Sequence, residues 1–103
     1  MEFSGKKVTV VGTGISGIGA VGLLNAVGAE VVLYDGNEKL KIEDIEKKLG
    51  TYKAEIVLGE LTKELTDSSD LLVISPGVPI DSPVVKAFEA AGVPVWGEVE
   101  LAY

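Results

Sequence analysis

The sequence predicts an α/β fold of the Rossmann-like, doubly wound kind, with five parallel strands and helices on both faces of the sheet. Two observations support this fold class. Short aliphatic or β-branched runs alternate with segments of helical character along the chain, as in parallel sheets joined by crossover helices. A glycine-rich turn, GTGISG at residues 12–17, directly follows the first of these runs. Because such crossovers are right-handed, the most economical strand order is 3-2-1-4-5.

The first strand and the first helix flank the glycine-rich turn. Residues 8–11 are a continuous run of Val and Thr, which is typical of a strand covered on both faces. A helix is expected over 16–27, because its small and apolar side chains suit close packing on a sheet and Gly28 is a typical residue beyond a helix end. The chain therefore begins with a strand, a turn and a helix in immediate succession.

The next two strands enclose an amphipathic helix. Residues 30–34 (EVVLY) form the second strand, which the turn-forming residues Asp35-Gly36-Asn37 bring to an end. Residues 54–58 (AEIVL) form a short third strand. Between them a surface helix closed by Gly50 is expected, because apolar residues recur at helical spacing among Lys and Glu, namely Ile42, Ile45 and Leu49.

The last part of the chain predicts two further strands and two helical segments. Residues 62–69 are expected to form a short helix or turn, and residues 71–75 (LLVIS) a fourth strand that stops at Pro76-Gly77. Residues 93–96 follow as a fifth strand.

The helix before the fifth strand has clear signals at both ends. Ser82 suits the N-cap position and Pro83 the first helical position. The helix is expected to run up to Gly92, with an apolar face made of Val84, Val85, Phe88 and Ala91.

Length and composition indicate one small domain, residues 1–103, outside the nucleic-acid-binding and membrane classes. A chain of 103 residues has the usual size of one compact domain. Its net charge of −7, from 9 Lys and Arg against 16 Asp and Glu, repels a nucleic-acid backbone. No apolar stretch approaches the ~18 residues of a membrane span, and the first residues resemble no secretory signal. We therefore expect a cytoplasmic, monomeric protein without nucleic-acid or membrane partners.

The residue types that are missing narrow the chemistry. The sequence contains no His and no Cys, which excludes the usual zinc sites, thiol nucleophiles and histidine bases. It also lacks a GxxxxGK[ST] loop for nucleoside triphosphates. The sequence favours a binding module, with no metal site and no catalytic residues of its own.

Three predicted loops converge at the carboxyl ends of the strands, where ligands bind in sheets of this order. They are the glycine-rich turn 12–17, the turn at Asp35 and the segment Ser75-Pro76-Gly77. An Asp35 carboxylate at this edge accepts hydrogen bonds from a ribose or a base. The hydroxyl groups of Ser16 and Ser75 suit donation to phosphate, and Gly77 allows its backbone to approach a ligand.

The glycines of the first loop have separate roles. Gly12 allows the tight turn, Gly14 the close approach of backbone to an anion, and Gly17 the contact between helix and strand. The unpaired N–H groups and the dipole at the start of the helix favour a diphosphate there. A structural alternative stays open for each loop: glycines that serve packing only, ordinary turn chemistry at Asp35, and a stiff strand end at Ser75-Pro76-Gly77.

Three segments together resemble the N-terminal domain of the Mur ligases, and among these the ligases that add D-glutamate in peptidoglycan synthesis. They are GKKVTVVGTGISGIGAVGLL at 5–24, the strand ending in Tyr34-Asp35, and LLVISPGVPIDSPVVKAFEAAGVPVWGEVEL at 71–101. SPGVP at 75–79 is the most specific part. The resemblance covers essentially the whole chain.

The resemblance implies the N-terminal part of a three-domain, ATP-dependent ligase. In that family this domain binds the UDP of UDP-MurNAc-L-Ala, whereas ATP, Mg²⁺ and D-glutamate are bound by central and C-terminal domains that this chain lacks. The isolated chain is therefore expected to be inactive, and the gene is expected to continue beyond Tyr103.

The resemblance also assigns site residues. Ile15 and Ser16 are expected to present backbone N–H groups to the diphosphate, Asp35 to contact the uracil or ribose, and Gly77 to approach the ligand by its backbone. Some family members have a hydroxyl residue and then Arg after the acid, where this chain has Gly36 and Asn37. Contacts from that turn to uracil are therefore open.

An NAD-binding regulatory module, like those of potassium-transport regulators, is the alternative from another functional class. Such modules also end the second strand in an acid, and Gly59-Glu60 after the third strand suits them. The SPGVP segment does not. A complete hydride-transfer enzyme is disfavoured because five strands leave out much of the second nucleotide-binding half.

Overall fold

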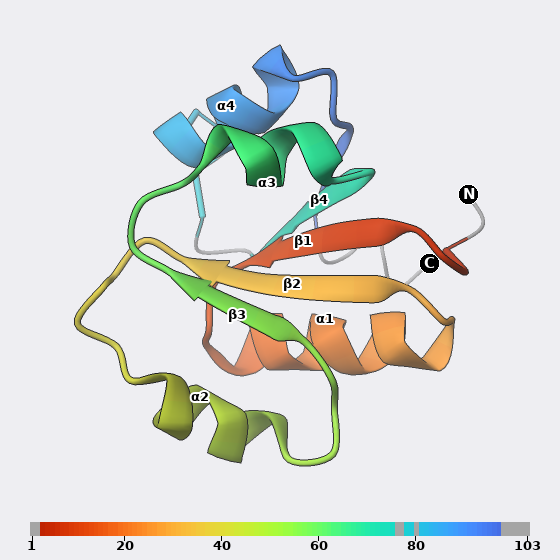
Figure 1. The fold of residues 1–103 in the computed structure, drawn as a ribbon, viewed down its shortest axis with the longest axis vertical. Coiled ribbons are helices and arrows are strands. Elements are labelled where there is room, and N and C mark those ends of the chain that lie inside the picture. Colours follow the sequence, from red (N-terminus) through yellow and green to blue (C-terminus); the bar gives the residue numbers. More distant parts are fainter. Residues whose placement is uncertain (1–2, 76–77, 80, 98–103) are drawn as a thin grey trace.

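The fold is an open, all-parallel sheet of five strands in the order β3-β2-β1-β4-β5 (Figure 1). The computed structural model describes residues 3–75, 78–79 and 81–97. Each neighbouring pair of strands is parallel, which confirms the predicted fold class and strand order. The strands are β1 (Lys7–Val11), β2 (Glu30–Asp35), β3 (Glu55–Leu58), β4 (Leu71–Ile74) and β5 (Val95–Gly97).

In the described residues, four helices cover the two faces of this sheet. Figure 1 shows α1 and α2 on one face and α3 and α4 on the other. Such coverage is expected when each parallel crossover is a helix. The short helix between β3 and β4 settles the prediction of a helix or turn in favour of the helix. The bounds are α1 (Ile15–Ala26), α2 (Ile42–Leu49), α3 (Lys63–Ser68) and α4 (Pro83–Ala90).

The central strand β1 is buried on both faces because its side chains alternate between two apolar clusters. Val8 and Val10 pack in the cluster under α1 and α2, and Val11 packs in the cluster under α3 and α4. The neighbouring strands follow the same alternation, since Val10 lies opposite Leu33 of β2 and Val73 of β4. The continuous apolar run of β1 therefore supplies both halves of the core.

One polar pair crosses the core beneath α3. Thr9 is fully buried, and its hydroxyl oxygen lies 2.7 Å from that of Ser69. Ser69 donates its own hydrogen to the carbonyl oxygen of Leu65 at 2.7 Å, so Thr9 is the donor in the pair. The hydroxyl hydrogens of Thr9 and Ser69 therefore both have an acceptor, which limits the desolvation cost of placing Thr9 in the core.

Side-chain caps fix the starts of α3 and α4. Ser82 accepts a hydrogen bond from the backbone N–H of Val85 at 3.4 Å, and Pro83 occupies the first helical turn. These contacts confirm the predicted N-terminus of α4. Thr62 caps α3 in the same way, since its hydroxyl oxygen accepts from the N–H of Leu65 at 3.3 Å.

Three details of the last helix and the last two strands differ from the prediction. The fifth strand begins at Val95 rather than Val93, because the Val93 N–H is donated to the carbonyl of Phe88 at the end of α4 and Pro94 has no N–H. Ala91 is exposed as the C-cap of α4 and is not part of its apolar face. β4 ends one residue before Ser75, whose carbonyl accepts from Val78 N–H in a turn.

Within the part of the chain that the structure describes, no helix is long and apolar enough to cross a membrane. Two large apolar side chains near the end of α1 are nonetheless about half accessible, Leu23 within the helix and Val27 at its C-cap (47% and 48%).

The burial pattern predicts that two identical substitutions have different effects. Val85→Ala removes two methyl groups from a side chain that is 1% exposed, and we expect it to lower the free energy of unfolding by about 2 kcal/mol. Val27→Ala, at a site 48% exposed, is the matched control and should change it by less than about 0.5 kcal/mol. Urea unfolding monitored by circular dichroism measures both. Equal losses would contradict the assignment of Val85 to the core.

Candidate functional site

The loops at the carboxyl ends of β1, β2 and β4 begin at the same level of the sheet. Val11, the last residue of β1, lies opposite Tyr34 of β2 and Ile74 of β4. The strand order also reverses between β1 and β4, which is where open α/β sheets bind ligands. The structure therefore brings the turn 12–14, Asp35 and Ser75 together, as the sequence predicts.

The turn between β1 and α1 depends on two glycines. Gly12 has a φ of +107°, a conformation that side chains rarely allow, and its N–H extends the ladder with β2 by donating to the carbonyl of Tyr34 at 2.8 Å. A Cβ atom at Gly17 would overlap the carbonyl oxygen of Gly12. The first turn of α1 therefore lies directly against the turn that precedes it, so the close approach expected at Gly17 is made to Gly12 just beyond β1.

Gly14 is the N-cap of α1 and is exposed. Any amino acid can adopt its φ of −75°, and a Cβ atom at this position would have no heavy atom within 4 Å apart from those of Gly14 itself and its two chain neighbours. Nothing inside the described fold therefore demands glycine at this position. The free space beside Gly14 is where the sequence predicts that an anion approaches the backbone.

The start of α1 differs from the starts of the other helices. Its N-cap makes no side-chain hydrogen bond and its first turn has no acidic residue. By contrast, hydroxyl groups cap α3 and α4, and α2 has Glu43 and Asp44 in its first turn. The N–H groups of Ile15, Ser16 and Gly17 belong to this first turn, where helix geometry provides no acceptor. The positive end of the α1 dipole therefore faces the loop with no capping side chain and no acidic residue in its first turn.

Asp35 is the last residue of β2, and hydrogen bonds hold both of its carboxylate oxygens. Oδ2 accepts from the hydroxyl group of Thr13 at 3.1 Å, and Oδ1 accepts from the N–H of Asn37 at 3.0 Å. The bond to Asn37 is the local turn chemistry that was the alternative to a ligand role. The two roles are compatible, because an ionised carboxylate has about four lone-pair sites and these bonds use two.

The other residues of that turn are open to solvent. Gly36 and Asn37 are exposed, and the Asn37 side-chain oxygen accepts from the N–H of Lys39 at 3.1 Å. This second side-chain-to-backbone bond continues the turn toward α2. The turn is thus shaped by its own polar groups, and whether it contacts uracil stays a prediction.

Thr13 and Tyr34 take part in the site, although the sequence analysis did not select them. Tyr34 is buried, and its hydroxyl group donates to the carbonyl of Gly59 at 2.5 Å, which ties the loop after β3 to β2. Burial raises the pKa of the Tyr34 phenol, and the charges of Asp35 and Glu60 raise it further. The sequence could have pointed to Thr13 and Tyr34 only by their position, because each is the direct neighbour of a predicted site residue.

The side chain of Ser75 is hydrogen-bonded to the backbone of β1. Its hydroxyl group donates to the carbonyl oxygen of Val11 at 3.1 Å, so its hydrogen is used by the end of β1 and not free for a phosphate. A Cβ atom at Gly12 would also lie 3.1 Å from this hydroxyl oxygen. Ser75 therefore joins the ends of β1 and β4. Pro76 and Gly77, the other two predicted site residues in this segment, lie outside the described residues.

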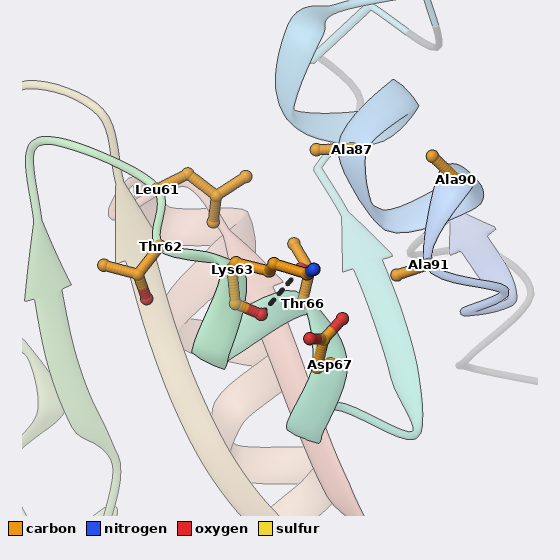
Figure 2. Close-up of a pocket in the computed structure, with 8 residues that line it drawn as sticks. All are labelled: Leu61, Thr62, Lys63, Thr66, Asp67, Ala87, Ala90 and Ala91. Carbon is orange, nitrogen blue, oxygen red and sulfur yellow. Dashed lines mark hydrogen bonds between the residues drawn. The ribbon is translucent and has the colours of Figure 1, made fainter.

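The structure also has a surface groove of about 380 Å³ between α3 and α4 (Figure 2). Figure 2 shows the small side chains of α4 facing Lys63, Thr66 and Asp67 of α3, with the Thr66 hydroxyl group bonded to the Lys63 carbonyl. No residue of the glycine-rich turn lines this groove, and neither does Asp35. The candidate site is therefore defined by the convergence of loops and not by this hollow.

The described residues offer no metal site that would suit catalysis. None of their Asp and Glu side chains form a group of three or more that could hold a metal ion.

Comparison with known proteins identifies the family. Residues 6–97 match the family model described as the N-terminal domain of MurD-like Mur ligases. A protein of Lachnospira eligens is 63% identical over 103 residues, which is all of this chain and 23% of that protein. One of Lachnoclostridium phytofermentans is 53% identical with the same coverage. Both are named UDP-N-acetylmuramoylalanine--D-glutamate ligase, and the chain thus spans about a quarter of their length.

Solved structures confirm the fold. A pseudomurein peptide ligase type C from Methanothermus fervidus aligns with a TM-score of 0.72 at 23% identity, over 94% of this chain and 20% of that one. A shikimate dehydrogenase from Aquifex aeolicus aligns with a TM-score of 0.67 at 17% identity, over 98% of this chain and 45% of that one. The fold is thus shared by ligases and dehydrogenases, whereas the sequence match is to ligases. The chain belongs to the MurD-like Mur ligase family and corresponds to the N-terminal domain of its members.

Proposed function

We propose that this chain binds the UDP part of UDP-MurNAc-L-Ala, as the N-terminal domain of a cytoplasmic, monomeric ligase that adds D-glutamate in peptidoglycan synthesis. The observation that carries this proposal is the juxtaposition of the uncapped start of α1 with the Asp35 carboxylate. The start of α1 suits a diphosphate, and the Asp35 carboxylate suits the hydrogen-bond donors of a nucleoside. The names of the similar proteins supply the identity of the substrate.

The diphosphate fits the start of α1. The N–H groups of Ile15, Ser16 and Gly17 lack acceptors in the helix, and the helix dipole adds a positive partial charge there. The open space beside Gly14 gives a phosphate access to this backbone. The half-buried Ser16 supplies a hydroxyl group from the same turn. No cationic side chain belongs to the turn, so binding would depend on neutral donors.

The nucleoside fits beside Asp35. Each carboxylate oxygen of Asp35 accepts one internal hydrogen bond and keeps one lone-pair site. An ionised carboxylate only accepts, so it selects ligand groups that donate, such as a uracil imide or a ribose hydroxyl. In the proposed complex Gly36 and Asn37 lie near the base without the arginine that some family members have.

The ligation itself is assigned to parts of the longer relatives that this chain does not cover. In the proposed reaction the substrate carboxylate would take the terminal phosphoryl group of ATP, with ADP as the leaving group and Mg²⁺ offsetting the phosphate charge, and the D-glutamate amine would then displace inorganic phosphate to form the amide. This chain would hold the nucleotide end of the substrate in a fixed position, which lowers the entropic cost of presenting its other end. An NAD-binding regulatory role has less support, because the family model and the similar proteins by sequence are ligases.

Ligand titration tests the proposal directly. We expect UDP-MurNAc-L-Ala and UDP to shift the backbone amide NMR signals of Gly14, Ser16 and Asp35, because these groups face the proposed ligand. NAD is the comparison ligand and should shift them less at equal concentration. Shifts at these residues with NAD alone would overturn the proposal in favour of the regulatory module.

A proline substitution tests the role of the helix N–H groups. Ile15→Pro removes one N–H donor at the first position of α1, a position that tolerates proline in helices; the extended Gly14 (ψ −175°) is compatible with a following proline. We expect the Kd for UDP to rise about tenfold, as for a lost hydrogen bond to a charged group. Ile15→Ala keeps the N–H and should change the Kd by less than about twofold. Equal effects of the two variants in calorimetric or NMR titrations would show that the N–H is not a ligand donor.

A further inference from the structure

A side-chain hydrogen bond links the two halves of the proposed nucleotide site. Thr13 lies in the glycine-rich turn between Gly12 and Gly14, and only 7% of it is exposed. Its hydroxyl group donates to Oδ2 of Asp35 at 3.1 Å. The turn faces the proposed diphosphate, whereas Asp35 faces the proposed nucleoside. The bond therefore connects the group that would hold the phosphates to the group that would hold the nucleoside.

The two internal donors fix the orientation of the Asp35 carboxylate. The N–H of Asn37 holds Oδ1 at 3.0 Å, and Thr13 holds Oδ2. Rotation of the carboxylate about its Cβ–Cγ bond would lengthen both hydrogen bonds. The lone-pair sites that remain free on the two oxygens therefore point in fixed directions, which is the condition for selecting a donor pattern in a ligand.

The two donors are not equivalent. Asn37 belongs to the same turn as Asp35, so this bond shapes the turn but does not place it against the rest of the site. Thr13 comes from the loop after the neighbouring strand, where the last backbone contact between the two strands is the Gly12 N–H to the Tyr34 carbonyl at 2.8 Å. The Thr13 bond continues that pairing beyond the strand ends, and so sets the carboxylate relative to the phosphate loop.

We propose that Thr13 is a positioning residue that directs the Asp35 carboxylate toward the nucleoside of a bound nucleoside diphosphate, and so couples nucleoside recognition to diphosphate binding. The inference rests on the proposed function, because it presumes a nucleoside diphosphate in this site. It predicts that loss of the Thr13 hydroxyl group weakens ligands that carry a nucleoside and spares those that consist of phosphates alone.

Thr13→Val and Thr13→Ser, titrated with UDP and with inorganic pyrophosphate, test this role. Val keeps the branched shape and removes the hydroxyl group, and we expect the Kd for UDP to rise about fivefold to tenfold. The Kd for pyrophosphate should stay within about twofold. Ser restores the donor and should return the Kd for UDP to within about twofold of the original. Thr51→Val, an exposed threonine in the connection from α2 to β3, is the matched control and should leave both constants unchanged.

A double substitution shows whether Thr13 acts through Asp35. In a chain with Asp35→Ala, adding Thr13→Val should change the Kd for UDP by less than about twofold, since the group that Thr13 positions is gone. A full further loss in this background would overturn the proposal. The dispersion of the amide NMR signals reports whether each variant is folded, and Thr13→Ala replaces Thr13→Val if the latter is not.

The outcomes separate the inference from the function on which it rests. If the unmodified chain binds UDP and Thr13→Val binds it equally well, Thr13 has no positioning role, although the proposed function stands. If Thr13→Val weakens pyrophosphate as much as UDP, Thr13 shapes the phosphate loop and the proposal is wrong. If the unmodified chain binds UDP no more tightly than pyrophosphate, the nucleoside adds no affinity, and the proposed function and the inference fail together.

Discussion

The contact between the first turn of α1 and the loop before it is the constraint on which the site depends. Because Gly17 has no Cβ, the helix lies against the carbonyl oxygen of Gly12, and any side chain there would push it away. This contact places the start of α1 directly beyond the end of β1, where its N–H groups face the loops. It also sets the depth at which Val21 and Leu24 of the same helix pack into the core. The absence of a side chain at Gly17 therefore allows the start of the helix to pack directly beside Gly12.

Beyond the strand ends, side chains replace the backbone ladder in holding the loops together. Ser75 joins the ends of β4 and β1 through the Val11 carbonyl, and Tyr34 joins β2 to the loop after β3 through the Gly59 carbonyl. Thr13 and Asp35 join the loops after β1 and β2. Burial raises the pKa of the Tyr34 phenol, and its hydroxyl group donates to the Gly59 carbonyl. The loops after β1, β2 and β3 and the end of β4 are thus held together beyond the last rungs of the sheet.

The sequence was sufficient for the fold because each of its signals was local. Apolar runs, helix-ending glycines and the Ser82-Pro83 start each indicate one element, and the handedness of parallel crossovers then gives the strand order. The sequence could not show which hydroxyl groups meet which partners. Thr13 reaches Asp35 only because the strand register places Val11 opposite Tyr34, and Ser75 turns inward for a similar reason. The prediction placed the start of β5 at Val93, two residues too early. The Val93 N–H instead donates to a carbonyl at the end of α4, and the sequence does not show which of the two elements takes this N–H.

An acidic domain that binds a diphosphate must separate its own charge from that of the ligand. The net charge of −7 is screened over about 8 Å at physiological salt, but Asp35 lies within the site and is not screened in this way. Thr13 belongs to the glycine-rich turn itself, and its hydroxyl group donates to the Asp35 carboxylate. In the complex that we propose, the Asp35 carboxylate would face the nucleoside, and the N–H groups of α1 would be the donors to the phosphates. Neutral donors would then hold the phosphates, because the Thr13 bond keeps the carboxylate turned toward its own partners.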